Sequence, residues 1–125
     1  MSTWTRDTLK HIAAAEELHI APRDDDGSLR KPTTIWVVRD RDELYVRSWR
    51  GTRGAWWNTA QASHTGHISA GSAEADVTFT AVSDPAVNDR VDDAYRAKYG
   101  HYSGYVETMI SEQARATTLR LAPQP

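Results

Sequence analysis

Apolar residues near the start of the chain recur at helical spacing, which predicts that the chain opens with a helix. Leu9 and Ile12 fall on one face, and Thr3 or Thr5 can cap the first turn with a side-chain oxygen. Another helix is predicted after Asp84-Pro85, because a carboxylate cap followed by proline at the first helical position favours helix initiation. Shorter helices are expected over 56–65, ended by Gly66, and near 105–110.

Alternating apolar and polar residues, rich in β-branched side chains, predict six short strands. They cover 18–20, 33–39, 43–48, 67–70, 75–82 and 117–121. Helices lie toward both ends of the chain and one crosses between groups of strands, without the strict β-α-β alternation of a doubly wound sheet. This order predicts an α+β fold: a small six-stranded antiparallel barrel with N-terminal, crossing and C-terminal helices, formed by residues 1–125 as one domain.

The strand predicted at 33–39 is apolar on both faces. Ile35 and Val37 share one face, and Trp36 and Val38 share the other. A strand of this kind is buried on two sides, as in a barrel wall that carries a helix or a second subunit. Because Trp36 and Val38 require an apolar cover, we expect a homodimer.

Composition narrows the class of protein. The formal net charge of −2 argues against a general attraction to nucleic acid or to anionic membranes. The longest apolar stretches are only a few residues, too short for a transmembrane helix, and the first residues do not resemble a signal peptide. The chain has no cysteine, which excludes disulfides, thiolate metal sites and thiol nucleophiles. We therefore expect a cytoplasmic protein with neither membrane nor nucleic acid as its partner.

The strongest candidate chemistry lies in residues 47–58, which we call the Arg–Trp segment. Its basic and aromatic members are Arg47, Trp49, Arg50, Arg53, Trp56 and Trp57. Residues 30–53 carry seven basic and three acidic side chains, a local charge of +4 in a chain of net charge −2. Guanidinium groups bind phosphate or carboxylate oxygens in pairs, Gly51 and Gly54 allow close approach of the backbone, and tryptophan faces stack on flat rings. The segment predicts a small-molecule anion site; the alternative is a solvated arginine loop whose tryptophans belong to the core.

Other clusters have simpler explanations. His64 and His67 could share a metal ion, but surface histidines explain the pair better, so no metal site is expected. The acidic run 24–27 is interpreted as a turn, because it lacks the ligand spacing of a calcium loop. Four tyrosines between 95 and 105 are interpreted as packing residues, with a phenol acting as an acid near a cofactor as the alternative. No catalytic residue can be assigned, so an enzymatic activity would depend on reactive atoms borrowed from a cofactor.

Several stretches resemble a known family. They are KPTTIWVV at 31–38, LYVRS at 44–48, GAWWN at 54–58, DVTF at 76–79, YRAKYG at 95–100 and ATTLRL at 116–121. On these stretches the chain is identified as a member of domain-of-unknown-function family 2255. It is also similar, more distantly, to the split-barrel flavin-binding superfamily of pyridoxamine-phosphate oxidase-like proteins and deazaflavin-dependent nitroreductases. The chain departs from those relatives at 62–65, where an Asn-Pro is replaced, and in using arginine in place of a common lysine.

The resemblance implies a split β-barrel that binds FMN or a deazaflavin, with the phosphate on the basic loop and the following short helix. The positions that match the binding stretch are Trp36, Arg47, Ser48, Arg50, Arg53 and Trp57. The flavin ring would lie against the strand that holds Trp36, between two subunits. The implied activity is a small-molecule oxidoreductase; the alternatives are a non-enzymatic module for a small anion and a nucleic-acid or protein interaction domain that uses the Arg–Trp segment.

Overall fold

A single curled antiparallel sheet organises the computed structural model, which describes residues 3–124. Its strands are β1 (Leu18–Pro22), β2 (Thr33–Ile35), β3 (Val38–Asp40), β4 (Glu43–Val46), β5 (Thr65–Ala70), β6 (Ala73–Ala81) and β7 (Leu119–Pro123). The helices are α1 (Arg6–Ala14), α2 (Ala55–Ser63), α3 (Pro85–Tyr99), α4 (Ser103–Met109) and α5 (Glu112–Arg115), with a 3₁₀ turn η1 (Gly51–Arg53). None of the helices within this described range is long and apolar enough to cross a membrane.

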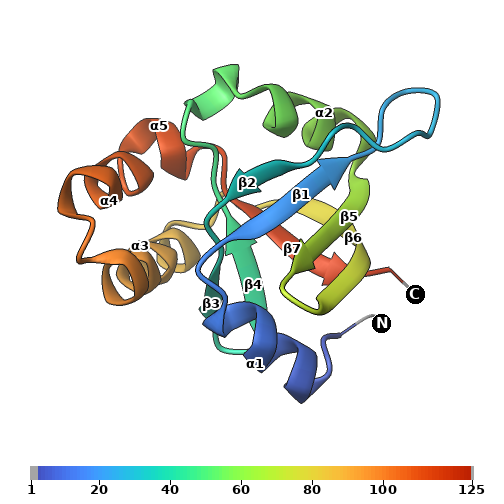
Figure 1. The fold of residues 1–125 in the computed structure, drawn as a ribbon. Helices are drawn as coiled ribbons and strands as arrows, with labels where there is room; N and C mark the ends of the chain where they lie inside the picture. Colours follow the sequence, from blue (N-terminus) through green and yellow to red (C-terminus); the bar gives the residue numbers. More distant parts are fainter. Residues whose placement is uncertain (1–2, 125) are drawn as a thin grey trace.

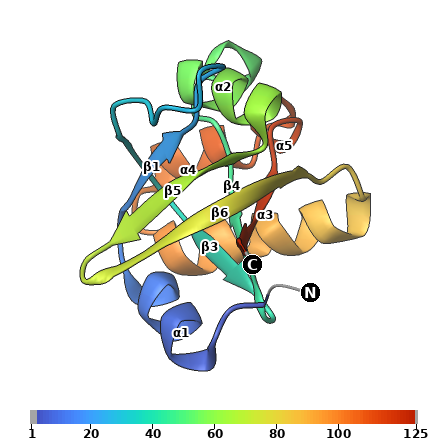
Figure 2. The same cartoon turned by 90° about the vertical axis from the view of Figure 1, so that its right-hand side faces the viewer.

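The strand order is β2-β1-β5-β6-β7-β4-β3, and every neighbouring pair is antiparallel. The sheet curls into a half-closed barrel, with α1 and α2 at opposite ends and α3 and α4 along one side (Figures 1 and 2). The two edge strands, β2 and β3, follow one another directly in the chain. The α+β split-barrel class is therefore confirmed.

The predicted number of six strands is wrong, because the strand expected at 33–39 is two strands. Its first half pairs with β1 (Leu18 opposite Ile35) and its second half with β4 (Val38 opposite Tyr45). Between the halves, Val37 turns to side chains of α3. Its N–H is 3.3 Å from the Tyr99 hydroxyl, and its carbonyl accepts a hydrogen bond of 2.7 Å from Lys98 Nζ. The strand is interrupted because Val37 bonds to residues of α3, which lie far along the chain. The local alternation of side chains therefore does not predict the break.

The two faces of this run enter two different clusters, as the alternation predicted. Val37 belongs to the main core inside the barrel, with Ile35 packed against it. Val38 lies in a second cluster with Tyr95 of α3, and Trp36 packs against that cluster. The cover over Trp36 and Val38 is thus formed by helices of the same chain. The reason given for a homodimer no longer applies, although the oligomeric state itself stays a prediction.

The predicted helix starts are confirmed at two caps, whereas one predicted helix end is wrong. The Thr5 side chain accepts from Thr8 N–H at 3.2 Å, and Asp84 caps α3 as expected. The expected stop of α2 at Gly66 is wrong, because the helix ends at Ser63 and its C-cap, His64, lies in the left-handed region (φ 64°). Gly66 lies inside β5, where an added Cβ would sit 2.7 Å from the carbonyl oxygen of Ala21. This glycine therefore serves the close approach of β1 and β5.

Candidate functional site

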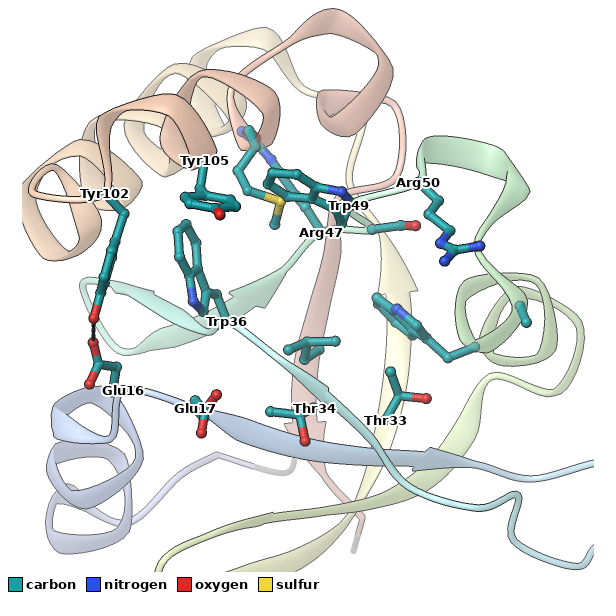
Figure 3. Close-up of a pocket in the computed structure, with 16 residues that line it drawn as sticks. Glu16, Glu17, Thr33, Thr34, Trp36, Arg47, Trp49, Arg50, Tyr102 and Tyr105 are labelled. Carbon is teal, nitrogen blue, oxygen red and sulfur yellow. Dashed lines mark hydrogen bonds between the residues drawn. The ribbon is translucent and has the colours of Figure 1, made fainter.

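A cleft of about 870 Å³ opens at the split of the barrel, where β2 runs into β3. Its walls come from the α1–β1 connection, β2, the end of β4, the first turn of α2, and α4 (Figure 3). The lining residues are Glu16, Glu17, Thr33, Thr34, Ile35, Trp36, Arg47, Ser48, Trp49, Arg50, Gly54, Ala55, Trp56, Tyr102, Tyr105 and Met109. A volume of this size suits a cofactor or another small molecule.

One end of the cleft has groups suited to an anion. Ser48 is 1% exposed, and its hydroxyl has no hydrogen-bond partner within residues 3–124. Gly54 is the N-cap of α2, whose first turn is not capped by a side chain in the described structure. A Cβ at Gly54 would lie 2.3 Å from Ser48 Oγ, so glycine leaves room for this hydroxyl. The free N–H groups of a helix start and a buried hydroxyl without a partner both favour a bound anion.

Arg50 adds a positive charge to the same end. Its side chain lies beside the α2 start and is exposed (Figure 3). Among the residues that the structure describes, it forms no ion pair. An exposed guanidinium with free donors can bind phosphate or carboxylate oxygens in pairs.

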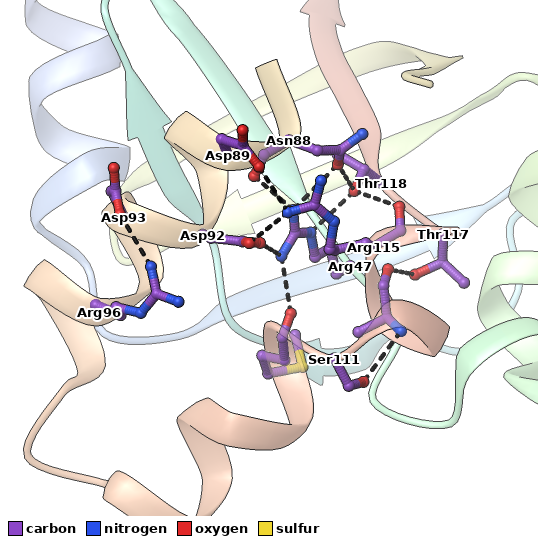
Figure 4. A network of polar contacts seen from close by, with 12 residues as sticks. Arg47, Asn88, Asp89, Asp92, Asp93, Arg96, Ser111, Arg115, Thr117 and Thr118 are labelled. Carbon is purple, nitrogen blue, oxygen red and sulfur yellow. Dashed lines mark hydrogen bonds and ion pairs between the residues drawn. The ribbon is translucent and has the colours of Figure 1, made fainter. Parts of the chain in front are cut away.

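Arg47 lies in the cleft wall with its guanidinium wholly buried in a polar network (Figure 4). Nη1 donates to Asp92 Oδ1 at 2.6 Å and to the Met109 carbonyl at 2.9 Å. Nη2 donates twice to Asn88, and Nε donates to Thr118 Oγ1 at 2.9 Å. These contacts use all five donors of the side chain. Arg47 therefore joins β4 to α3 and α4, and its charge is matched by a carboxylate of the protein.

Aromatic side chains form the middle of the cleft. Trp36 stacks on Tyr99 with ring centroids 4.0 Å apart and planes 3° from parallel. Trp49 and Tyr105 contact each other at 5.5 Å between centroids, and both are exposed, by 48% and 59%. Large aromatic faces that remain exposed beside a cleft can pack against a planar ligand.

The opposite end of the cleft is acidic. Glu16 and Glu17 lie on the α1–β1 connection, away from Arg50 (Figure 3). The Tyr102 hydroxyl donates to the Glu16 carboxylate, and this hydrogen bond raises the pKa of Tyr102. Tyr99 donates to the Glu16 carbonyl at 2.7 Å. These contacts hold the connection against α3 and α4.

The six residues expected to bind a cofactor are not all brought together. Trp36, Arg47, Ser48 and Arg50 line the cleft, whereas Arg53 and Trp57 are outside its lining. Arg53 is exposed on η1. Trp57 is buried, and its indole N–H donates to the Thr117 carbonyl at 3.0 Å, which gives this tryptophan a packing role.

Sequence reasoning missed the acidic end of the cleft. Glu16 and Glu17 follow the apolar positions of the first helix, and nothing nearby in the sequence distinguishes them from ordinary solvent-exposed residues. Tyr102 and Tyr105 belong to the tyrosines interpreted as packing residues, yet both line the cleft. Pairing of Glu16 with Tyr102, 86 residues later, brings the two groups together.

Residues 8–121 match the family described as "Uncharacterized protein conserved in bacteria (DUF2255)". The chain belongs to this family. The match extends from α1 into β7, so it covers both the barrel and every wall of the cleft. No curated protein matches the chain.

Solved structures with the same fold are distant in sequence. HutZ, a heme storage protein from Vibrio cholerae, has a TM-score of 0.69 at 12% identity, over 95% of this chain and 89% of HutZ. A FAD-binding protein from Mesorhizobium loti has a TM-score of 0.66 at 13% identity, over 98% and 90% of the two chains. A putative pyridoxamine 5'-phosphate oxidase from Listeria innocua has a TM-score of 0.63 at 10% identity, over 95% and 90%. These likenesses establish the split-barrel fold.

Proposed function

We propose that this DUF2255 protein binds a flavin-type cofactor, FMN or a deazaflavin, in the cleft and acts as an oxidoreductase on a small molecule. The observation that carries the proposal is the Ser48 hydroxyl, buried without a partner beside the uncapped start of α2. Because a buried hydroxyl without a partner is costly, a ligand oxygen at this point would be stabilising. Arg50 supplies the counter-charge that a phosphate requires.

The residues present fit such a cofactor. Ser48, Arg50 and the first N–H groups of α2 would hold its phosphate, and Trp36 and Trp49 would pack against its ring. When bound, the cofactor supplies hydride transfer, and the protein holds it in position. Arg47 contributes indirectly, because its contacts with Asp92 of α3 and Met109 of α4 fix the segment after β4 that carries Ser48.

Three neighbours of the same fold are described as heme-storing, FAD-binding and pyridoxamine-phosphate oxidase-like. They support a small-molecule ligand in general terms. Binding without catalysis, with the cleft holding a small anion, is the second candidate, and the same partnerless Ser48 supports it.

We extend the proposal to a homodimer in the cytoplasm. The exposed pair Trp49 and Tyr105 at the cleft is now the surface that a second copy would cover. Light scattering of the purified protein at micromolar concentration should then give twice the chain mass of 14.0 kDa. A monomer at that concentration would remove the dimer from the proposal and leave the cleft unaffected.

The cofactor is tested by titrating the protein with FMN and with a deazaflavin while following tryptophan fluorescence. Saturable quenching is expected in the parent, and Trp49→Phe should lose the share of it that comes from Trp49, while Trp36 and Trp56 in the same lining keep the rest. Trp57→Phe is the matched control, since Trp57 lies outside the lining. Arg50→Ala should weaken binding about tenfold or more without changing stability.

Two results would contradict the proposal. One is a response that does not saturate with either cofactor. The other is an Arg50→Ala variant whose affinity equals that of the parent. To separate enzyme from binding module, a reduced nicotinamide is added to the loaded protein, and bleaching of the visible flavin absorbance is followed. Loss of absorbance faster than with free flavin favours the oxidoreductase, and an unchanged rate favours the binding module.

A further inference from the structure

The two ends of the cleft carry opposite charges, which restricts the molecules that can fill it. Arg50 and the α2 start lie at one end, and Glu16 and Glu17 at the other (Figure 3). Within the described lining, the basic side chains are Arg47 and Arg50. Arg47 is already paired with Asp92, and Arg50 lies at the far end. The acidic end therefore has no basic lining residue available as its counter-ion.

The two carboxylates differ in their surroundings. Glu16 accepts from the Tyr102 hydroxyl and has His101 Nε2 at 4.0 Å. Lys98 also acts on Glu16 through its charge, but its ammonium is committed to the Val37 carbonyl. Glu17 forms no ion pair in the part of the chain that the structure describes. Glu17 is thus the carboxylate that is free to meet a ligand.

Aromatic rings stand beside these carboxylates. Trp36 and Tyr102 lie 5.7 Å apart between centroids, with planes tilted by 31°. One face of Trp36 is covered by Tyr99, and the side chain also lines the cleft. Aromatic faces attract cations through their ring electrons, and carboxylates attract them through charge. The combination suits a positively charged nitrogen attached to an apolar body.

We infer that the acidic end of the cleft binds an organic cation, a protonated amine on an apolar body, as the small-molecule substrate. The inference depends on the proposed function in one respect, that the cleft is a ligand site. The buried Ser48 hydroxyl without a partner, at the opposite end, is the observation that marks the cleft as a ligand site. Glu17 binds the ammonium group, the Tyr102 ring packs on the apolar body, and Glu16, held by the Tyr102 hydroxyl, adds charge.

The test titrates protein free of cofactor with 2-phenylethylammonium by isothermal calorimetry. 2-Phenylethanol, similar in shape and uncharged, is the matched probe. Saturable binding of the ammonium is expected, with the alcohol at least about tenfold weaker, because a charged hydrogen bond is lost. Glu17→Gln should weaken ammonium binding about tenfold. Glu107→Gln removes the same charge from an exposed α4 position outside the cleft lining and should bind as the parent does.

The inference is overturned by any of three results: no saturable binding of the ammonium, equal affinity for ammonium and alcohol, or a Glu17→Gln variant that binds like the parent. FMN titration of the same Glu17→Gln protein distinguishes this from failure of the proposed function. Its FMN affinity should equal that of the parent, because Glu17 lies at the end opposite Arg50. If the parent binds the ammonium through Glu17 but binds neither FMN nor a deazaflavin, the cation site stands and the cofactor proposal fails.

Discussion

Replacing Arg47 by methionine should destabilise the protein strongly, whereas the same change at Arg50 should not. The Arg47 side chain is 0% exposed and makes all five of its possible hydrogen bonds inside the protein. Breaking a buried ion pair from one side costs about 3–5 kcal/mol. Asp92 keeps a second partner, Arg115 Nη1 at 2.5 Å, so we expect the lower part of that range, about 3 kcal/mol. In a chain of 125 residues this corresponds to a fall in Tm of about 10–15 °C.

The assay is thermal and urea unfolding of the parent and the two variants, each followed by circular dichroism. Arg50→Met should stay within about 0.5 kcal/mol of the parent, as expected for an exposed side chain without partners. A fall in Tm of less than about 3 °C for Arg47→Met would refute the reasoning, because the buried network would then contribute nothing measurable. Equal losses in the two variants would refute it as well, since the argument depends on their difference in burial.

Two further predictions concern Gly54 and Lys98. Gly54→Ala should destabilise the protein by about 1–3 kcal/mol and weaken FMN binding, since the new Cβ would lie 2.3 Å from Ser48 Oγ. Gly104→Ala in α4 is the control, because the added carbon meets open space. It should be neutral or stabilising by up to about 1 kcal/mol. Urea unfolding checks both, and equal effects would contradict the steric argument. Burial lowers the pKa of Lys98 from 10.5 to about 8, so between these two pH values the amine loses its proton in the folded protein while it keeps it in the unfolded chain. The free energy of unfolding should therefore rise between pH 8 and 10 in the parent relative to Lys98→Met, and parallel pH profiles would count against a buried amine.

Much of the fold could be predicted from local signals. Thr5 and Asp84 carry short side chains at helix starts, and both act as caps in the structure. The faces assigned to Val37 and Val38 hold as well, because alternation along an extended chain is a local property. The break in the strand at Trp36 and Val37 could not be predicted, since it depends on partners in α3 more than 60 residues away.

The site was less accessible to sequence reasoning. Arg47 and Arg50 look alike in the sequence, and only burial separates them. The partner that neutralises Arg47, Asp92, lies 45 residues later and gives no nearby sign of its role. Glu17 lines the cleft because of the way the α1–β1 connection packs. This connection is irregular, so the spacing of apolar residues does not predict its position. The charge count identified a basic segment. It could not show which guanidinium groups are paired inside the protein and which are free to bind a ligand.

The two edge strands of the sheet, which follow one another in the chain, also affect how readily the protein can aggregate. A long exposed sheet edge offers unpaired main-chain groups on which another chain can add a strand. Here both edges, β2 and β3, have only three residues each and belong to one stretch of chain. Pro32, which has no N–H, precedes β2, and Arg41 in the left-handed region (φ 56°) follows β3. An incoming strand could form only a few hydrogen bonds before the template ends, so this architecture protects the open barrel against growth by strand addition.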